Sequence, residues 1–518
     1  MDQEATSRSA PRPTPRSAER SLMLAIDQGT SSSRAVVVDH TGAIVGQGQL
    51  DFESSFPHDG WVEQDPEVLW DTTVTGVRLA LADAGVGAAE LSGLGITNQR
   101  ETTLLWDRSS GRCLYPAIVW QDGRTADRCA LLRAEGHGEL IRQTTGLVID
   151  PYFSATKLSW LLDNVAGARQ QAEAGDLCFG TVDSFLLYRL TGGQVHLTDA
   201  TNASRTQLYD LKAQDWSEAM LELHNIPRSL LPQVRDCVSD FGATEASLFG
   251  ASIPIYGVAG DQQAALIGQN CLTDGMTKST YGTGCFLITN TGDQLRESGS
   301  RLLGTVAYRL DGKSTFALEG SIFVAGVAVK WLRDQLGLIQ DAKDTETCAR
   351  ATNGDTGGVY VVPAFTGLGA PHWQPAARGL VSGLTLDSSR EQIVTATLAS
   401  VAYQTEALAQ ALAGDGCAIS ELRVDGGMVG NSWLCQFLAD VLDVNVDRPR
   451  VIETTALGAA MLAGVGAGVF SSLVEAGECC VHSDQRFVAS MADDERGRLL
   501  AGWDEAVARV LYSPPTEP

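Results

Sequence analysis

Several features that mark common classes of protein are scarce or absent in this chain. Its 38 Lys and Arg are outnumbered by 63 Asp and Glu, and the formal net charge of −25 argues against a nucleic-acid partner, whose phosphates need a basic surface. The eleven cysteines contain no C-x-x-C pair, so we expect reduced, mostly buried thiols, with Cys479 and Cys480 as mere neighbours. The seven histidines show no H-x-x-x-H spacing, which disfavours a zinc site.

Signals for export, for membrane insertion and for two common nucleotide-binding folds are missing as well. Residues 1–20 are rich in Ser, Pro and Arg without an apolar run, which predicts a disordered tail and excludes a secretory signal. Residues 454–474 carry no charge, but their many Gly and Ala predict a helix packed tightly against a sheet, not a membrane span. The first hydroxyl-rich turn carries neither G-x-G-x-x-G nor G-x-x-x-x-G-K-S/T, which excludes Rossmann and P-loop sites there.

What is present is an α/β pattern, and a chain of 518 residues predicts roughly two to four domains. Strands are expected at residues 22–26, 34–39 and 43–50, with a helix around 68–81. Polar clusters follow the ends of three expected strands, at residues 27–33, 97–103 and 121–124. Because ligands in open α/β sheets bind beyond the carboxyl ends of strands, we expect these clusters to line a ligand site.

The central stretch combines a carboxylate with a glycine turn. An expected strand at 253–258 leads to Asp261 and a small-residue helix at 262–268, and residues 279–284 form a second strand and a Gly-Thr-Gly turn. A carboxylate between a strand and a helix can act as a base or hold a metal, and a Gly-Thr-Gly turn admits phosphate oxygens. These segments favour a hydroxyl substrate held against a nucleotide phosphate; a tight turn with a capping Asp is the alternative.

Further expectations concern the order of elements. A strand at 286–289 with a turn at 290–292 repeats the arrangement of residues 22–50, which predicts two homologous halves. Residues 321–336 predict a helix, and Ser388 with Glu391 predicts a capping box that opens another. Residues 198–206 are polar and turn-prone, so we expect them outside any core element.

The ordered set of motifs resembles the FGGY family of carbohydrate kinases. The match extends from about Leu22 to about Trp503, and its specificity comes from the order, because each motif alone is short. It rests on residues 25–30 with Arg34, 98–101, 119–121, 150–153, 198–205, 260–263, 281–286, 363–371 and 425–427. The resemblance implies a two-domain α/β fold like that of actin and hexokinase (the ribonuclease H-like ATPase fold), with ATP and substrate in an inter-domain cleft. We expect an N-terminal domain at residues 21–268, with the substrate site and first phosphate motif, and a nucleotide-binding C-terminal domain at 269–518.

Within the family, the site motifs are most similar to those of members that phosphorylate glycerol. The resemblance implies a transferase that uses ATP and Mg²⁺ to convert glycerol to sn-glycerol 3-phosphate, as a cytoplasmic homodimer or homotetramer. It implies that Asp261 is the general base, and that Asp27 and Asp261 ligate Mg²⁺. It implies substrate contacts from Arg100, Glu101, Trp120, Tyr152, Asp261, Gln262 and Phe286. It implies nucleotide contacts from Thr30, Ser31, Ser32, Arg34, Thr283, Gly284, Gly326, Lys330, Gly427 and Asn431.

The chain departs from the family's pattern in two places. Lys330 stands where the family often has Gln, which puts the nucleotide contacts near it in doubt. Residues 242–255 lack the Gly-rich, Arg-bearing loop through which some bacterial relatives bind a sugar bisphosphate, and the His that others offer for phosphorylation. We therefore expect neither control in this chain. Two alternatives stay open: a kinase for another polyol or a ketopentose, and a nucleotide-switched, chaperone-like binding protein on the same fold.

Overall fold

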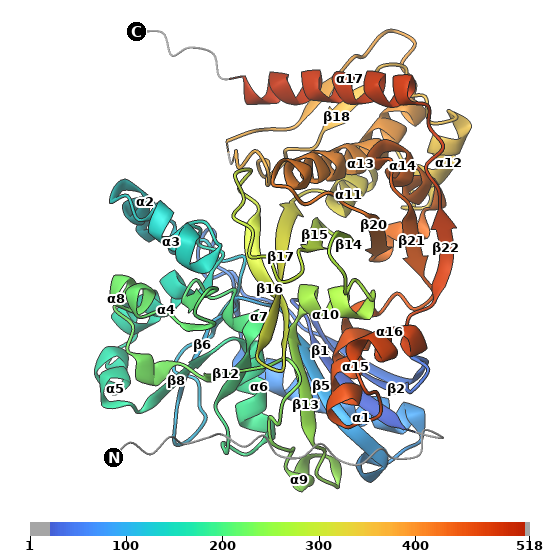
Figure 1. Cartoon of the computed structure of the whole chain (residues 1–518). Coiled ribbons are helices and arrows are strands. Elements are labelled where there is room, and N and C mark those ends of the chain that lie inside the picture. The colour runs from blue at the N-terminus through green and yellow to red at the C-terminus, as the bar shows by residue number, and fades with distance from the viewer. Residues whose placement is uncertain (1–20, 375, 513–518) are drawn as a thin grey trace.

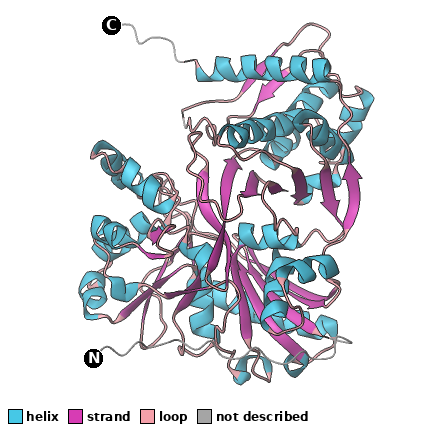
Figure 2. Ribbon diagram, viewed as in Figure 1, coloured by secondary structure: helices cyan, strands magenta, loops and turns pink. Residues whose placement is uncertain are grey.

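The computed structural model describes residues 21–374 and 376–512, which build two α/β bodies, one below the other in Figure 1. The lower body contains the first sheet and the upper body the second. Helices flank the strands in both bodies (Figure 2). The predicted disordered tail, residues 1–20, lies outside the described residues.

The first sheet has five strands in the order β13–β5–β1–β2–β3. The strands are β1 Leu22–Gln28, β2 Ser32–Asp39, β3 Ile44–Asp51, β5 Leu91–Asn98 and β13 Ile255–Gly260. β1 is antiparallel to β2 and parallel to β5, and β13 is parallel to β5. Leu24 packs in the cluster of α1 (Pro66–Ala84), whereas Met23 packs in the cluster of α15 (Thr454–Gly466). Both faces of the sheet are buried, which explains the continuous apolar run at residues 22–26.

The second sheet has seven strands in the order β16–β17–β15–β14–β20–β21–β22. The strands are β14 Met276–Tyr281, β15 Cys285–Asn290, β16 Leu303–Leu310, β17 Lys313–Ile322, β20 Glu421–Asp425, β21 Val446–Pro449 and β22 Ser483–Phe487. β14 is antiparallel to β15 and parallel to β20, as β1 is to β2 and β5. The predicted repeat of the opening hairpin is therefore present as a repeated strand arrangement.

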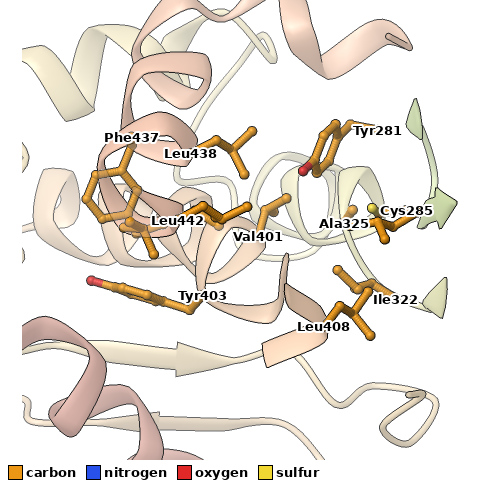
Figure 3. Packing of buried hydrophobic residues seen from close by; sticks show 14 of the residues in the cluster. Tyr281, Cys285, Ile322, Ala325, Val401, Tyr403, Leu408, Phe437, Leu438 and Leu442 are labelled. Atoms are coloured by element: carbon orange, nitrogen blue, oxygen red, sulfur yellow. The ribbon is translucent and has the colours of Figure 1, made fainter. Parts of the chain in front are cut away.

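The core of the upper body lies between the second sheet and its helices. Tyr281 and Cys285 come from β14 and β15, and they face Val401 of α13 (Arg390–Gly414) and Leu438 of α14 (Ser432–Leu442) (Figure 3). All four side chains are at most 1% exposed. This packing holds the Gly-Thr-Gly turn between β14 and β15 at a fixed place.

Most of the remaining helices and strands are short. The other helices are α2 Ala126–Ala134, α3 Gly138–Thr145, α4 Ser154–Asn164, α5 Ala168–Ala174, α6 Val182–Leu190, α7 Ala200–Ala203, α8 Glu218–His224, α9 Ala246–Phe249, α10 Asp261–Gly268, α11 Gly326–Asp334, α12 Asp344–Ala351, α16 Leu473–Cys480 and α17 Asp493–Leu511. The other strands are β4 Glu63–Gln64, β6 Leu104–Asp107, β7 Ala117–Ile118, β8 Leu177–Gly180, β9 Leu197–Asp199, β10 Tyr209–Asp210, β11 Asp215–Trp216, β12 Gln233–Arg235, β18 Tyr360–Val362 and β19 Leu380–Ser382.

Helix α15 confirms the prediction that the uncharged stretch after residue 454 packs tightly against a sheet. A Cβ on Gly95 of β5 would lie 2.0 Å from the carbonyl oxygen of Ala459, and one on Gly458 would lie 1.9 Å from that of Ala264 in α10. Only glycine permits backbones to approach this closely. Among the described residues, no helix combines the length and apolarity that a membrane crossing requires.

The β16–β17 hairpin connects the two bodies (Figure 1). The C-terminal half of β17 pairs with β15. The turn end of the hairpin reaches the first body, where Val306 and Phe316 join the cluster around α4. There Arg309 donates to Asp236 Oδ1 at 2.6 Å and to the Tyr209 hydroxyl at 3.1 Å. The register shifts between Val306 and Tyr308, where the hairpin passes from one body to the other.

Three expectations about local structure are wrong. The capping box lies one residue later, because the Ser389 hydroxyl accepts from Gln392 N and Ser389 N donates to Gln392 Oε1. Residues 321 and 322 end β17, so α11 begins only at Gly326. Residues 198–206 are buried throughout, because their polar groups bond to one another and to neighbouring segments: Asp199 caps α7, and Asn98 Nδ2 donates to Asn202 Oδ1 at 3.0 Å.

The cysteines follow the expectation of reduced thiols. All eleven lie within the described residues and are free, and nine of them are buried. Cys479 is exposed and its neighbour Cys480 is buried.

Candidate active site

Polar segments converge at the carboxyl edge of the parallel strands β1, β5 and β13. The register places Asp27 of β1 beside Thr97 of β5, and Gly260 of β13 beside Asn98. Asp27, Arg100 and Asp261 therefore leave the sheet at the same edge, and Trp120 N reaches this region by donating to Thr102 Oγ1 at 3.2 Å. The clusters at 27–33 and 97–103 therefore lie together as expected, whereas Asp122 and Arg124 of the third cluster bond to Val62 and Glu63.

Arg100 is the centre of a buried charge network at this edge. Its Nη1 and Nη2 donate to the two carboxylate oxygens of Glu319 on β17, at 2.7 and 2.9 Å. Its Nε lies 3.1 Å from Asp261 Oδ1 and 3.9 Å from Glu101 Oε1, without a hydrogen-bond partner. Arg205 continues the network, because its Nε donates to Glu101 Oε1 at 2.7 Å and its Nη2 to Glu319 Oε1 at 3.3 Å. Two arginines and two glutamates thus neutralise one another out of contact with water.

Glu101 is held in a backbone conformation that residues other than glycine rarely adopt. Its φ is 59°, and its carbonyl oxygen accepts from Ser154 Oγ at 2.9 Å and from Thr103 Oγ1 at 3.0 Å. Burial raises the pKa of its carboxyl group, and this outweighs the lowering by Arg100 and Arg205. Strain of this kind persists where the surrounding bonds over-determine it, which is typical of a functional site.

Three aromatic rings form a wall beside the charged cluster. The Trp120 ring meets Tyr152 and Phe286 edge-on, with centroids 5.5 and 6.3 Å apart. The Trp120 Nε1 donates to Thr30 Oγ1 at 2.9 Å. The buried Lys157 donates to the carbonyl oxygens of Trp120 and Tyr152, at 3.3 and 2.8 Å, and so fixes the wall from behind.

Gln262 extends from the first turn of α10 toward the second sheet. Its Oε1 accepts from Nζ of Lys278, a buried lysine on β14 that also donates to Thr280 Oγ1 at 2.8 Å. Burial lowers the pKa of Lys278, and nearby Asp425 and Asp261 oppose that shift. The amide nitrogen of Gln262 is therefore the end of this side chain that stays free to meet a ligand.

The first hydroxyl-rich turn lies between β1 and β2, next to Asp27. Burial raises the pKa of Asp27 to about 7; Arg34 opposes this shift and Asp261 adds to it. Two carboxylates that repel each other in this way suit a divalent cation, since Mg²⁺ binds one or two carboxylates together with water and substrate phosphates. Ser31 is exposed in the turn, with Thr30 and Ser32 half-buried. Arg34 forms an ion pair with Glu453 and donates to Gln49 Oε1.

The second predicted phosphate turn lies between β14 and β15, and glycines from two other segments adjoin it. Gly326 N donates to Gly282 O at 2.9 Å, and a Cβ on Gly284 would lie 2.5 Å from Ile322 O. A Cβ on Gly426 would lie 2.5 Å from Tyr281 O, so the loop before Gly427 reaches the same turn. A Cβ on Gly427 itself would meet nothing within 4 Å, which leaves its surface open for a ligand.

Lys330 and Asn431 belong to the helical segments that follow these glycines. Asn431 caps α14 by accepting from Leu434 N at 2.9 Å, and its Nδ2 donates to Thr345 Oγ1 at 3.3 Å. Lys330 is exposed on α11, one turn after Gly326. The structure thus brings Thr283, Gly284 and Gly326 together, whereas Lys330 lies one turn into α11 and Asn431 is the N-cap of α14.

Sequence reasoning missed three buried residues that support the site: Glu319, Lys278 and Lys157. Each is a charged residue within a helix or strand, and each side chain is fully buried. Glu319 follows Phe316, Ala317 and Leu318 in β17, and this lone carboxylate in an apolar strand is the signal that could have indicated it.

The chain is similar to known carbohydrate kinases along nearly its whole length. Residues 22–268 match the N-terminal domain, and residues 277–467 the C-terminal domain, of the FGGY family of carbohydrate kinases. Glycerol kinase 1 of Pseudomonas aeruginosa is 59% identical over 94% of this chain and 98% of that protein. Glycerol kinase of Rhodospirillum rubrum is 56% identical over 94% of this chain and 99% of that protein.

Solved structures agree with the sequence comparison. Plasmodium falciparum glycerol kinase with ADP superposes with a TM-score of 0.90 at 35% identity, covering 96% of this chain and 99% of that one. Gluconate kinase from Lactobacillus acidophilus, at 20% identity, shares the fold with a TM-score of 0.85, covering 94% of this chain and 98% of that one. The two family models together match most of the residues, and the relatives are similar along nearly their whole length. This chain is therefore a member of the FGGY family of carbohydrate kinases.

Proposed function

We propose that this chain transfers the γ-phosphoryl group of ATP to glycerol and produces sn-glycerol 3-phosphate. The observation that carries the proposal is the Arg100–Glu101–Asp261 cluster beside the aromatic wall of Trp120, Tyr152 and Phe286. Adjacent hydroxyls can accept from Arg100 Nε and donate to the two carboxylates, while the carbon backbone packs against the rings. The high identity to glycerol kinases supports the same substrate.

In the proposed mechanism, Asp261 accepts the proton of the attacking hydroxyl. The hydroxyl oxygen forms a bond to the γ-phosphorus as the bond to the β–γ bridging oxygen breaks, and ADP leaves. Arg100, Glu101 and Gln262 orient the substrate, and the wall excludes water from its carbon face. Thr30, Ser31, Ser32, Arg34, Thr283 and Gly284 contact the phosphates, and Gly326, Lys330, Gly427 and Asn431 contact the rest of the nucleotide. Asp27 and Asp261 would hold Mg²⁺, which neutralises charge on the transferred phosphate.

A substrate panel tests the proposal. The wild-type protein is assayed with ATP and Mg²⁺ against glycerol, xylulose, gluconate and no added substrate, and ADP release is measured. We expect glycerol to give the highest kcat/KM. A higher value for xylulose would favour the ketopentose alternative, and slow ATP hydrolysis alone would favour a chaperone-like binding protein. The cytoplasmic location and the homodimeric or homotetrameric assembly stay predictions.

A further inference from the structure

Glu319 is a buried carboxylate that reaches the substrate residues from the opposite body. It lies on β17 of the second sheet, where its neighbours in register are Ile288 of β15 and Leu303 of β16. Its side chain is fully buried, and both of its partners, Arg100 and Arg205, belong to the first body. The contact therefore joins the two bodies at the substrate site.

The hydrogen bonds of Arg100 come from its two terminal nitrogens and leave Nε without a partner. Glu319 accepts from both terminal nitrogens, and Gln263 Oε1 accepts from Nη1 at 3.2 Å. Only Nε lacks a hydrogen-bond partner, and it lies between the carboxylates of Asp261 and Glu101. A two-pronged bond to a planar guanidinium fixes its plane as well as its position.

The network keeps Glu319 charged. Although burial opposes ionisation, Arg100 and Arg205 bring the pKa of Glu319 down to about 2. Without the charge of Glu319, Glu101 would be the one buried carboxylate within ion-pair distance of both Arg100 and Arg205. Arg100 would then be free to turn toward Glu101 or Asp261 and cover the donor that a substrate hydroxyl would use.

We propose that Glu319 is a positioning residue for substrate hydroxyls: it orients Arg100 across the boundary between the two bodies so that Nε faces the site. This inference rests on the proposed function, because the hydroxyls are those of glycerol. It adds that glycerol binding depends on the relative placement of the bodies, since the residue that orients Arg100 moves with the second sheet.

The test compares Glu319→Gln, Glu319→Asp and a matched control, Glu421→Gln. Glu421 is also a second-sheet glutamate between two arginines, bonded to Arg423 at 2.9 Å and 3.5 Å from Arg486. We expect Glu319→Gln to raise the glycerol KM about tenfold or more, the scale of a lost charge-assisted hydrogen bond. The ATP KM and glycerol-independent ATP hydrolysis should change less than about twofold. Glu319→Asp should lie between wild type and Glu319→Gln, and Glu421→Gln should leave the glycerol KM unchanged.

Several outcomes would overturn the assignment. The first is a folded Glu319→Gln with a near-native glycerol KM. The second is a loss of glycerol-independent ATP hydrolysis as large as the effect on glycerol, which would indicate a structural role alone. If Glu319→Gln fails to fold, an unchanged glycerol KM in Glu319→Asp overturns the positioning role of Glu319. Failure of the proposed function is separate: wild type would then prefer another substrate of the panel. The same variants are in that case compared on that substrate, and an unchanged KM again overturns the positioning role.

Discussion

Replacing Asp261 by Asn isolates the proposed base from the rest of the site. Asn keeps the size of the side chain, and its Oδ1 can still accept from Gln262 N, which lies 2.7 Å away at the start of α10. It can also still face Arg100 Nε at about the present 3.1 Å. Because the side chain is 30% exposed, no buried charge is left without a partner and folding should change little. What disappears is the ability to take a proton, together with one of the two negative charges that would help to hold Mg²⁺.

The expected loss is therefore in kcat. A positioned base contributes a factor of about 10² to 10⁴, which corresponds to about 2.7–5.5 kcal/mol of activation free energy. A coupled ADP-release assay gives kcat, and calorimetric titration with glycerol gives Kd, which should change little. Asp65→Asn is the control, since Asp65 is also a carboxylate at a helix start, capping α1. A kcat for Asp261→Asn within tenfold of wild type would refute the assignment of the base.

Four further outcomes are expected. Gly458→Ala should lower the free energy of unfolding by about 1–3 kcal/mol in urea titrations, because its Cβ would lie 1.9 Å from Ala264 O; an unchanged midpoint would contradict that packing. Saturating glycerol with a non-hydrolysable ATP analogue should reduce the radius of gyration in small-angle scattering, and an unchanged value would count against domain closure. Millimolar fructose 1,6-bisphosphate should leave the initial rate unchanged, since residues 240–252 carry two acids, no base and two isolated glycines; saturable, salt-resistant inhibition would disprove this. Burial lowers the pKa of His224 to about 4, so the unfolded chain binds the proton more readily between pH 6.5 and 4. Stability is then fully present above pH 6.5 and falls by roughly 3 kcal/mol toward pH 4, and His224→Leu should remove that part of the melting-temperature profile.

The local sequence pattern predicts much of the architecture, because the spacing of apolar residues and the turn residues determine where strands and turns form. The apolar run at 22–26 lies in β1, and the small-residue helix expected at 262–268 is α10, which starts at Asp261. Residues 198–206 are buried although they are polar, because their polar groups bond to one another, and polarity alone does not reveal such bonds. The carboxylate of Glu319 is visible in the sequence, but its two partners are not, since both lie more than one hundred residues away in the chain.

The position of α15 in the sequence has a consequence for biosynthesis. This helix covers one face of the first sheet, yet it is made more than 400 residues after β1. Until it leaves the ribosome, Met23, Ala25, Val36 and Val38 have no partner from it, and the nascent chain presents an apolar face. A chain that stops before residue 454 lacks that cover, so premature termination yields an aggregation-prone fragment in place of a smaller folded protein.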